Sequence, residues 1–169
     1  RRPIPCTGDG LPALFGSEPA QATACRQAIK AAAMIAANVE HLNHQVAMDL
    51  RRPIQFGIGI HGGDVIIGDI GYRERTVFTA LGDAVNVAAR LQDMTKQLDC
   101  KLVVSEEVCK TAGIDVDTLT PATVEIRGRD ELMAIRTAVD PTVLTSLLDC
   151  PIDVVAPAVA GESPIPSVA

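Results

Sequence analysis

The chain has 169 residues, of which 47% are hydrophobic and 21% are charged, and its formal net charge at pH 7 is −6. This length is sufficient for one domain with a hydrophobic core. Because only 2% of the residues are aromatic, Ala, Val, Ile and Leu must build that core. A surface that follows a phosphate backbone needs clustered Lys and Arg. The basic pairs at 1–2 and 51–52 are isolated, so we expect no nucleic-acid partner.

The five cysteines are scattered and show no CxxC spacing; they are Cys6, Cys25, Cys100, Cys109 and Cys150. This pattern argues against a disulfide framework and a structural zinc site, and it favours a reducing compartment. We see no signal peptide and no apolar run long enough to span a bilayer. We therefore expect a cytoplasmic domain.

The first half of the chain predicts one long helix and two hairpins. An Asp-Gly pair at residues 9–10 favours a hairpin. Apolar residues at helical spacing predict a helix over 19–49. We expect 54–61 and 64–71 to pair through the glycine turn at 62–63, with strand glycines where another backbone approaches closely.

The second half alternates strands and helices. Ser105 is expected to cap a helix that stops at Gly113, and the final hairpin is expected to turn at Gly128. The other expected elements are strands at 76–82 and 100–105, a helix at 84–98, the hairpin at 122–139 and a short helix at 142–148. This order predicts an α+β fold with helices packed on a mostly antiparallel sheet.

The helix expected at 84–98, in "ALGDAVNVAARLQ", carries an unusual polar pair. A buried stripe is predicted from Val87, Leu91, Met94 and Leu98. Asn86 and Arg90 share the next stripe, one turn apart and close to a cap expected at Asp83. An amide and a guanidinium near a helix start can bind a phosphoryl group. The alternative is that both are solvated residues beside the core, and spacing alone leaves both readings open.

The wider context of this helix resembles a known family. The run "FGIGIHGGDVIIGDIGYRERTVFTALGDAVNVAARL" (56–91) resembles the class III adenylyl and guanylyl cyclase catalytic domain, nearest its bacterial Thr-containing type. The likeness continues, in the family's order, in "GDGLPALFG", "VVSEEV" and "VEIRGRDELM". It implies a ferredoxin-like, palm-type sheet, with a cyclase domain at 1–140 and a C-terminal tail at 141–169.

The resemblance also implies roles for single residues. Arg90 matches the arginine that stabilises the α-phosphoryl group, and Asn86 matches the asparagine that orients the ribose. Thr79 falls at the base-reading position, Arg127 at a triphosphate-binding position, and Asp9 at one of two aspartates that hold a pair of Mg²⁺ or Mn²⁺ ions. For the last three, an inward-facing strand threonine, an exposed hairpin arginine and a turn aspartate remain the alternatives.

The implied activity is the conversion of ATP to 3′,5′-cyclic AMP and pyrophosphate in a pocket shared by two subunits of a homodimer. Asp9 of one subunit would then face the other four site residues of its partner. The family's other metal aspartate lies in an N-terminal Phe-x-Asp-Ile segment, which this sequence lacks along with the first strand and helices. Pro5 occupies a position where adenylyl cyclases often carry a base-reading lysine. We therefore expect a longer natural protein, with a regulatory or sensor domain, or an inactive product.

Two alternatives to an adenylate cyclase stay open: a guanylate cyclase that uses GTP, and an inactive module for dimerisation or nucleotide sensing. A diguanylate cyclase is disfavoured because Val65 follows the Gly-Gly-Asp run. His41 and His44 are spaced to share a metal, but with no third ligand in the sequence we interpret them as solvated helix residues. His61 is expected to be structural.

Overall fold

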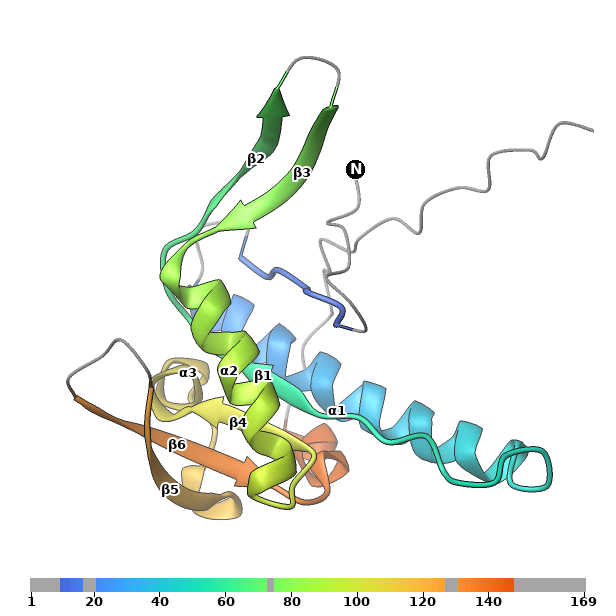
Figure 1. Ribbon diagram of the computed structural model, residues 1–169. Helices are drawn as coiled ribbons and strands as arrows, with labels where there is room; N and C mark the ends of the chain where they lie inside the picture. Colours follow the sequence, from blue (N-terminus) through green and yellow to red (C-terminus); the bar gives the residue numbers. More distant parts are fainter. Residues whose placement is uncertain (1–9, 17–20, 73–74, 127–130, 148–169) are drawn as a thin grey trace, which may run out of the picture.

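The computed structural model describes residues 10–16, 21–72, 75–126 and 131–147 (Figure 1). Its α-helices are α1 (Gln21–Gln45), α2 (Asp83–Gln97) and α3 (Glu106–Ala112). Its strands are β1 (Ile58–Ile60), β2 (Ile66–Tyr72), β3 (Arg75–Leu81), β4 (Leu102–Ser105), β5 (Thr120–Glu125) and β6 (Leu132–Ala138). Two 3₁₀ helices, η1 (Val116–Thr118) and η2 (Pro141–Leu147), complete the described elements.

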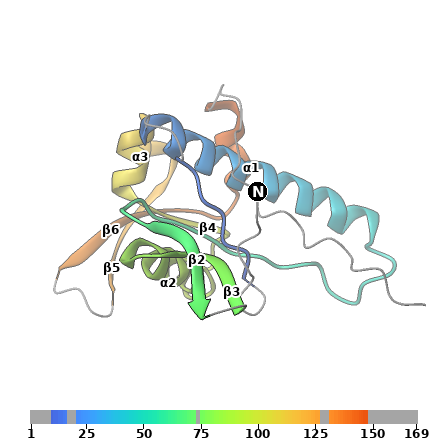
Figure 2. The ribbon, with the colours of Figure 1, turned by 90° about the horizontal axis from the view of Figure 1, so that it is seen from above.

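The central sheet has four strands in the order β1-β4-β6-β5. β1 runs parallel to β4, whereas β4 with β6 and β5 with β6 are antiparallel. Helices α1 and α3 lie on one side of this sheet and α2 lies on the other, as seen from above in Figure 2. The α+β class with a mostly antiparallel sheet is therefore confirmed.

Each face of the sheet has its own core, built largely from aliphatic side chains as the composition requires. On the α1 side, Ile29 and Ala33 of α1 pack with Leu102 and Val104 of β4 and with Leu144 of η2. On the other side, Val87 and Leu91 of α2 pack with Val103 of β4 and Ile135 of β6. β4 is buried on both faces because its successive side chains point alternately into the two cores.

The pairing predicted between 54–61 and 64–71 is wrong. β1 pairs in parallel with β4, with Ile60 opposite Val104, whereas β2 pairs antiparallel with β3. Ile58 and Ile60 pack against the core on the α1 side, and this burial favours β1 inside the sheet. The glycines at 62–63 connect two extended segments and do not reverse the chain.

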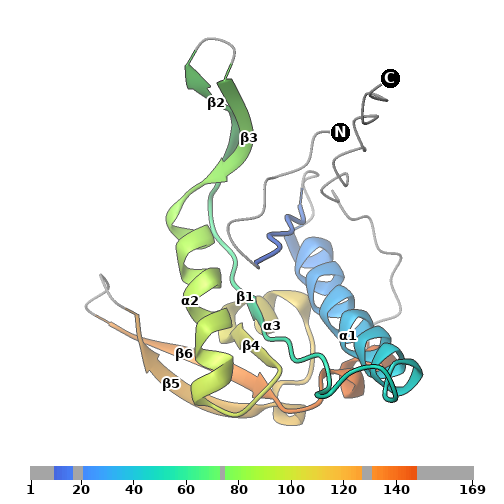
Figure 3. The same ribbon diagram turned by 45° about the vertical axis from the view of Figure 1, so that its right-hand side comes forward.

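The β2–β3 hairpin projects from the body of the protein as an arm (Figures 1 and 3). Its register runs from Ile66 opposite Leu81 to Tyr72 opposite Arg75. Ile66, Ile67 and Leu81 at its base are 75%, 46% and 53% exposed. Ile66 and Leu81 are cross-strand partners, so exposed apolar side chains lie together at the base of the arm.

The ends of α2 and α3 lie within one residue of the predicted positions, whereas α1 ends at Gln45 and not at residue 49 as predicted. α2 begins at Asp83, and Gly82 occupies the N-cap position predicted for Asp83. Ser105 is the N-cap of α3 as predicted, yet its hydroxyl makes no capping hydrogen bond and lies 3.0 Å from Nδ1 of His61. Gly113 ends α3 in the left-handed conformation, with φ 66°, which glycine adopts at little cost.

The buried stripe predicted for α2 is partly wrong. Val87 and Leu91 are fully buried and Met94 is half-buried, but Leu98 is 39% exposed because it follows the last helical turn as the C-cap. Ala84 and Thr95 complete the buried face. The buried face of α2 therefore includes the small side chains Ala84 and Thr95 in place of the larger Leu98.

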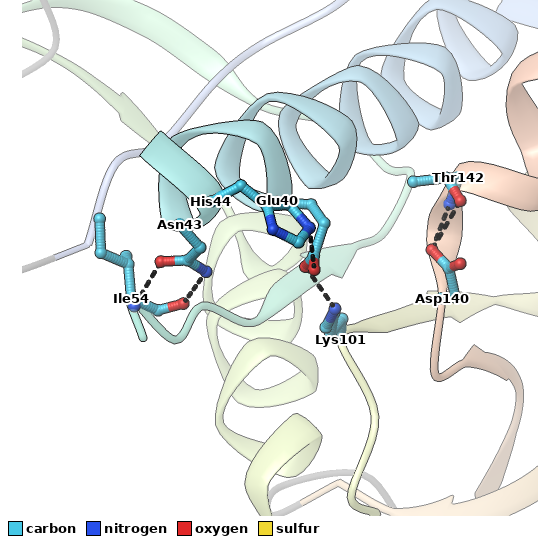
Figure 4. Close-up of polar contacts among 7 residues, drawn as sticks. All are labelled: Glu40, Asn43, His44, Ile54, Lys101, Asp140 and Thr142. Atoms are coloured by element: carbon cyan, nitrogen blue, oxygen red, sulfur yellow. Dashed lines mark hydrogen bonds and ion pairs between the residues drawn. The ribbon is translucent and has the colours of Figure 1, made fainter. Parts of the chain in front are cut away.

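Polar contacts hold the C-terminal part of α1 to the chain that follows it (Figure 4). The Asn43 side-chain amide donates to the carbonyl of Ile54 at 3.1 Å and its oxygen accepts from the Ile54 N–H at 2.7 Å. Glu40 lies 3.7 Å from Lys101, at the start of the β4 segment. The Asn43 contacts hold the segment between α1 and β1, and the Glu40–Lys101 ion pair joins α1 to the start of the β4 segment.

η2 packs against α1, and its Leu144 is fully buried. The Asp140 carboxylate accepts from the backbone N–H of Thr142 at 3.0 Å and from its hydroxyl at 2.7 Å, which supports the start of this turn (Figure 4). The predicted short helix at 142–148 is thus a 3₁₀ helix. The division of the chain at residue 140 stays a prediction.

Candidate functional site

Asn86 and Arg90 lie in the N-terminal half of α2, four residues apart and therefore about 40° from each other around the helix axis. Asn86 is exposed and Arg90 is half-buried. Neither belongs to the cores that α2 forms with the sheet. The shared, accessible face that the sequence predicts for this pair is therefore present.

Thr79 belongs to β3, where it is opposite Gly68 of β2. β3 ends at Leu81 and α2 begins at Asp83, so a single bend at Gly82 joins the strand of Thr79 to the helix of Asn86. A Cβ on Gly82 would lie 2.6 Å from the carbonyl oxygen of Asp64, so this bend is packed against the start of the arm. Thr79 and the polar pair on α2 thus lie on one continuous strand–bend–helix unit.

Asp9 and Arg127 lie outside the described residues, as does the turn expected at Gly128. In the described part of the chain, no group of three or more His, Cys, Asp or Glu side chains is arranged to hold a metal ion. Asp9 stays the one metal ligand that the family resemblance implies.

A hollow of about 810 Å³ lies between α3 and the start of β6, among residues that the sequence analysis did not assign to a site. It is lined by His61, Ser105, Glu106, Glu107, Lys110, Thr111, Glu131, Leu132, Met133 and Ala134. Its lining includes no residue of α2, so it is separate from the predicted site. Charges of both signs line it, without one chemistry that identifies a ligand.

Beside this hollow, Glu106 of α3 accepts a hydrogen bond from Nη2 of Arg136 at 2.8 Å, and its Oε1 lies 3.6 Å from Nζ of Lys110. The Arg136 hydrogen bond is the main cause that holds the pKa of Glu106 below its usual value. No periodicity in the sequence signals this pair, because 30 residues separate its members.

Comparison with known proteins places this geometry in a family. The family model described as the adenylate and guanylate cyclase catalytic domain matches residues 3–136. An adenylate cyclase from Anabaena cylindrica is 33% identical over 135 residues, which cover 76% of this chain and 26% of that protein. Adenylate cyclase 1 from Rhizobium meliloti is 27% identical over 128 residues, covering 76% of this chain and 19% of that protein.

Solved structures give the same result. The guanylyl cyclase Cya2 superposes with a TM-score of 0.65 at 25% identity, covering 79% of this chain and 67% of that chain. A bacterial light-regulated adenylyl cyclase superposes with a TM-score of 0.55 at 29% identity, covering 73% of this chain and 38% of that chain.

This chain spans about a quarter of the Anabaena relative. Among the described residues, none of the helices has the length and apolar character needed to cross a membrane. The match over residues 3–136 and the shared fold lead to one conclusion: the chain belongs to the family of adenylate and guanylate cyclase catalytic domains.

Proposed function

We propose that this chain is the catalytic domain of an adenylate cyclase that converts ATP to 3′,5′-cyclic AMP and pyrophosphate. The observation that carries the proposal is the pair of Asn86 and Arg90, one helical turn apart on the accessible face of α2, in a chain of this family. The family model matches residues 3–136, a range that includes this pair.

The proposed reaction joins the ribose 3′-oxygen to the α-phosphorus and breaks the bond between that phosphorus and the oxygen bridging to the β-phosphate. The hydroxyl proton passes to solvent, and pyrophosphate leaves. Negative charge builds on the α-phosphoryl oxygens, which the Arg90 guanidinium stabilises with fixed, charged donors. Asn86 holds the ribose so that its hydroxyl is in line for attack.

Arg127 is proposed to bind the triphosphate, and Asp9 is proposed to hold Mg²⁺ or Mn²⁺. A metal ion pair, when bound, polarises the phosphoryl oxygens and neutralises the leaving pyrophosphate. Asp9 supplies a single carboxylate, whereas a pair of metal ions needs at least one more acidic ligand. The same shortage is what supports the second candidate, an inactive module that binds nucleotide or dimerises.

We further propose that the active form is a homodimer in which Asp9 of one subunit faces Thr79, Asn86, Arg90 and Arg127 of the other. Two features support this. Asn86 is exposed on a single protomer, so the other half of an enclosing pocket has to come from another surface. Ile66 and Leu81 of the arm are exposed apolar side chains suited to a subunit contact.

We propose ATP rather than GTP as the substrate because the two relatives described above are named adenylate cyclases. Chemistry alone does not decide, since the Thr79 hydroxyl is able to accept from the adenine amino group or donate to the guanine carbonyl. The relatives' greater length supports a regulatory or sensor domain elsewhere in the natural protein. A requirement for cellular ATP, together with the free thiols Cys25, Cys100 and Cys109, supports a cytoplasmic location.

The test is to incubate the full-length natural protein with Mn²⁺ and either ATP or GTP, and to detect the product by mass spectrometry. We expect cyclic AMP from ATP. Cyclic GMP at a higher rate would identify a guanylate cyclase. Tight nucleotide binding with no cyclic product would select the inactive module.

A further inference from the structure

β1 and α2 lie backbone against backbone. A Cβ built on Gly59 would overlap the carbonyl oxygen of Ala88 and the backbone nitrogen of Gln92, and it would lie 3.0 Å from the Gln92 Cα, where ordinary contact begins near 3.4 Å. Residues four apart are joined by a hydrogen bond in an α-helix, so this Cβ would press on the helix backbone itself. Only a glycine fits here without moving α2.

Two more glycines continue this contact on either side of Gly59. A Cβ on Gly63 would lie 2.9 Å from the Cβ of Ala84, and a Cβ on Gly57 would overlap Oγ1 of Thr95. We call Gly57, Gly59 and Gly63 the glycine track. The track meets α2 near both of its ends and at its middle, so it sets the height of the helix over the sheet.

The track faces the side of α2 roughly opposite the polar pair. At about 100° per residue, Asn86 and Arg90 lie roughly 140–180° around the axis from the mean direction of Ala88 and Gln92. A side chain added at Gly59 would therefore push α2 in the direction in which Asn86 and Arg90 project. The displacement needed to reach normal van der Waals separation is roughly 1 Å.

We propose that Gly59 is a positioning residue for catalysis: the absence of its side chain fixes how far Asn86 and Arg90 reach into the substrate pocket. This inference rests on the proposed function. A misplacement of about 1 Å in groups that stabilise a transition state costs about 100-fold in rate. Substrate binding, which uses many weaker contacts, is expected to change far less.

The test compares Gly59→Ala with wild type in the full-length natural protein. We expect kcat to fall at least tenfold while KM changes less than threefold. The matched control is Gly62→Ala, whose added Cβ would meet only the Cγ2 of Val108 on α3, at 3.3 Å, and so leaves α2 in place. Equal kcat in folded Gly59→Ala and wild type would overturn the inference.

A wild-type protein that makes no cyclic product would overturn the proposed function instead. The inference is then decided by crystal structures of wild type and Gly59→Ala. The Arg90 Cα is expected to move by about 1 Å relative to β4, the shift that relieves the overlap. An unmoved Arg90 would overturn the inference.

If Gly59→Ala does not fold, Gly63→Ala decides the question. Its contact is with the Ala84 Cβ, while the Ala84 Cα is 3.9 Å away, so Ala84→Gly removes the overlap. We expect Gly63→Ala to lower kcat and the double variant to regain most of it, with Ala84→Gly alone as the control for lost helix propensity. A folded double variant that stays as slow as Gly63→Ala would contradict the positioning role.

Discussion

Arg136 of β6 and Glu106 of α3 are joined by a hydrogen bond of 2.8 Å that fastens the short helix to the sheet. Nη1 of the same arginine donates to the carbonyl of Val116 at 3.3 Å. The Arg136 side chain is only 14% exposed, so the Glu106 carboxylate compensates a positive charge that is largely removed from water. One pair of side chains thus connects β6, α3 and the 3₁₀ turn η1.

The pKa of Glu106 predicts how this pair responds to acid. Because Arg136 holds the pKa below its usual value, the folded state binds fewer protons here than the unfolded state. The resulting stability is present above the unfolded glutamate value of about 4.3 and is lost as pH falls through the lower folded value. Thermal unfolding followed by circular dichroism between pH 7 and pH 3 should show a shallower fall for Glu106→Gln than for wild type. Glu107→Gln, at the neighbouring exposed position, is the control for replacing a glutamate on α3; parallel curves for Glu106→Gln and wild type would refute the assignment.

Leu91 and Leu98 test the packing of α2. Leu91 is fully buried, so Leu91→Ala should lower the free energy of unfolding by about 2–5 kcal/mol through lost burial and a cavity. Leu98 is 39% exposed, and Leu98→Ala should cost less than about 1 kcal/mol. Urea unfolding of the two variants measures the difference. Similar losses would mean that α2 extends its buried face past Gln97.

Arg90 and Asp9 test the shared active site. Arg90→Ala alone should lower kcat by about 10²–10³, the usual cost of removing a donor to a developing negative charge. Mixing Arg90→Ala with Asp9→Ala protein should restore roughly a quarter of wild-type activity, because half of the exchanged dimers are mixed and each has one intact site. Cyclic AMP formation in the mixture is the measurement. Folded variants that exchange subunits without any recovery would exclude a site built from two chains.

We predict that two subunits meet at the exposed apolar base of the arm. Ile66 is 75% exposed, and Ile66→Lys should weaken dimerisation at least tenfold by placing a charge in an apolar interface. Val139, which is 69% exposed and lies outside the arm, provides the matched control as Val139→Lys. Sedimentation velocity across a range of protein concentrations compares the two variants. An Ile66→Lys protein that dimerises like Val139→Lys would show that the arm is not the contact.

The sequence alone determined the α+β class, most helix and strand positions and the family. These features depend on residues close together in the chain: the apolar spacing of α1, the glycine that ends α3 at 113, and the polar pair at 86 and 90. Helical periodicity was enough to put Asn86 and Arg90 on one face, because that relation is fixed by four residues of backbone geometry.

Tertiary structure alone decided which segments meet. β1 pairs with β4, about forty residues away, and not with β2 as the glycine turn indicated. The Ser105 hydroxyl lies 3.0 Å from Nδ1 of His61 and makes no capping hydrogen bond to its own helix, and Gly59 is needed because α2 passes across it. Local sequence encodes how a segment bends and which of its faces is apolar. The partner that covers that face is chosen by the combined burial of distant segments, which no single stretch of residues contains.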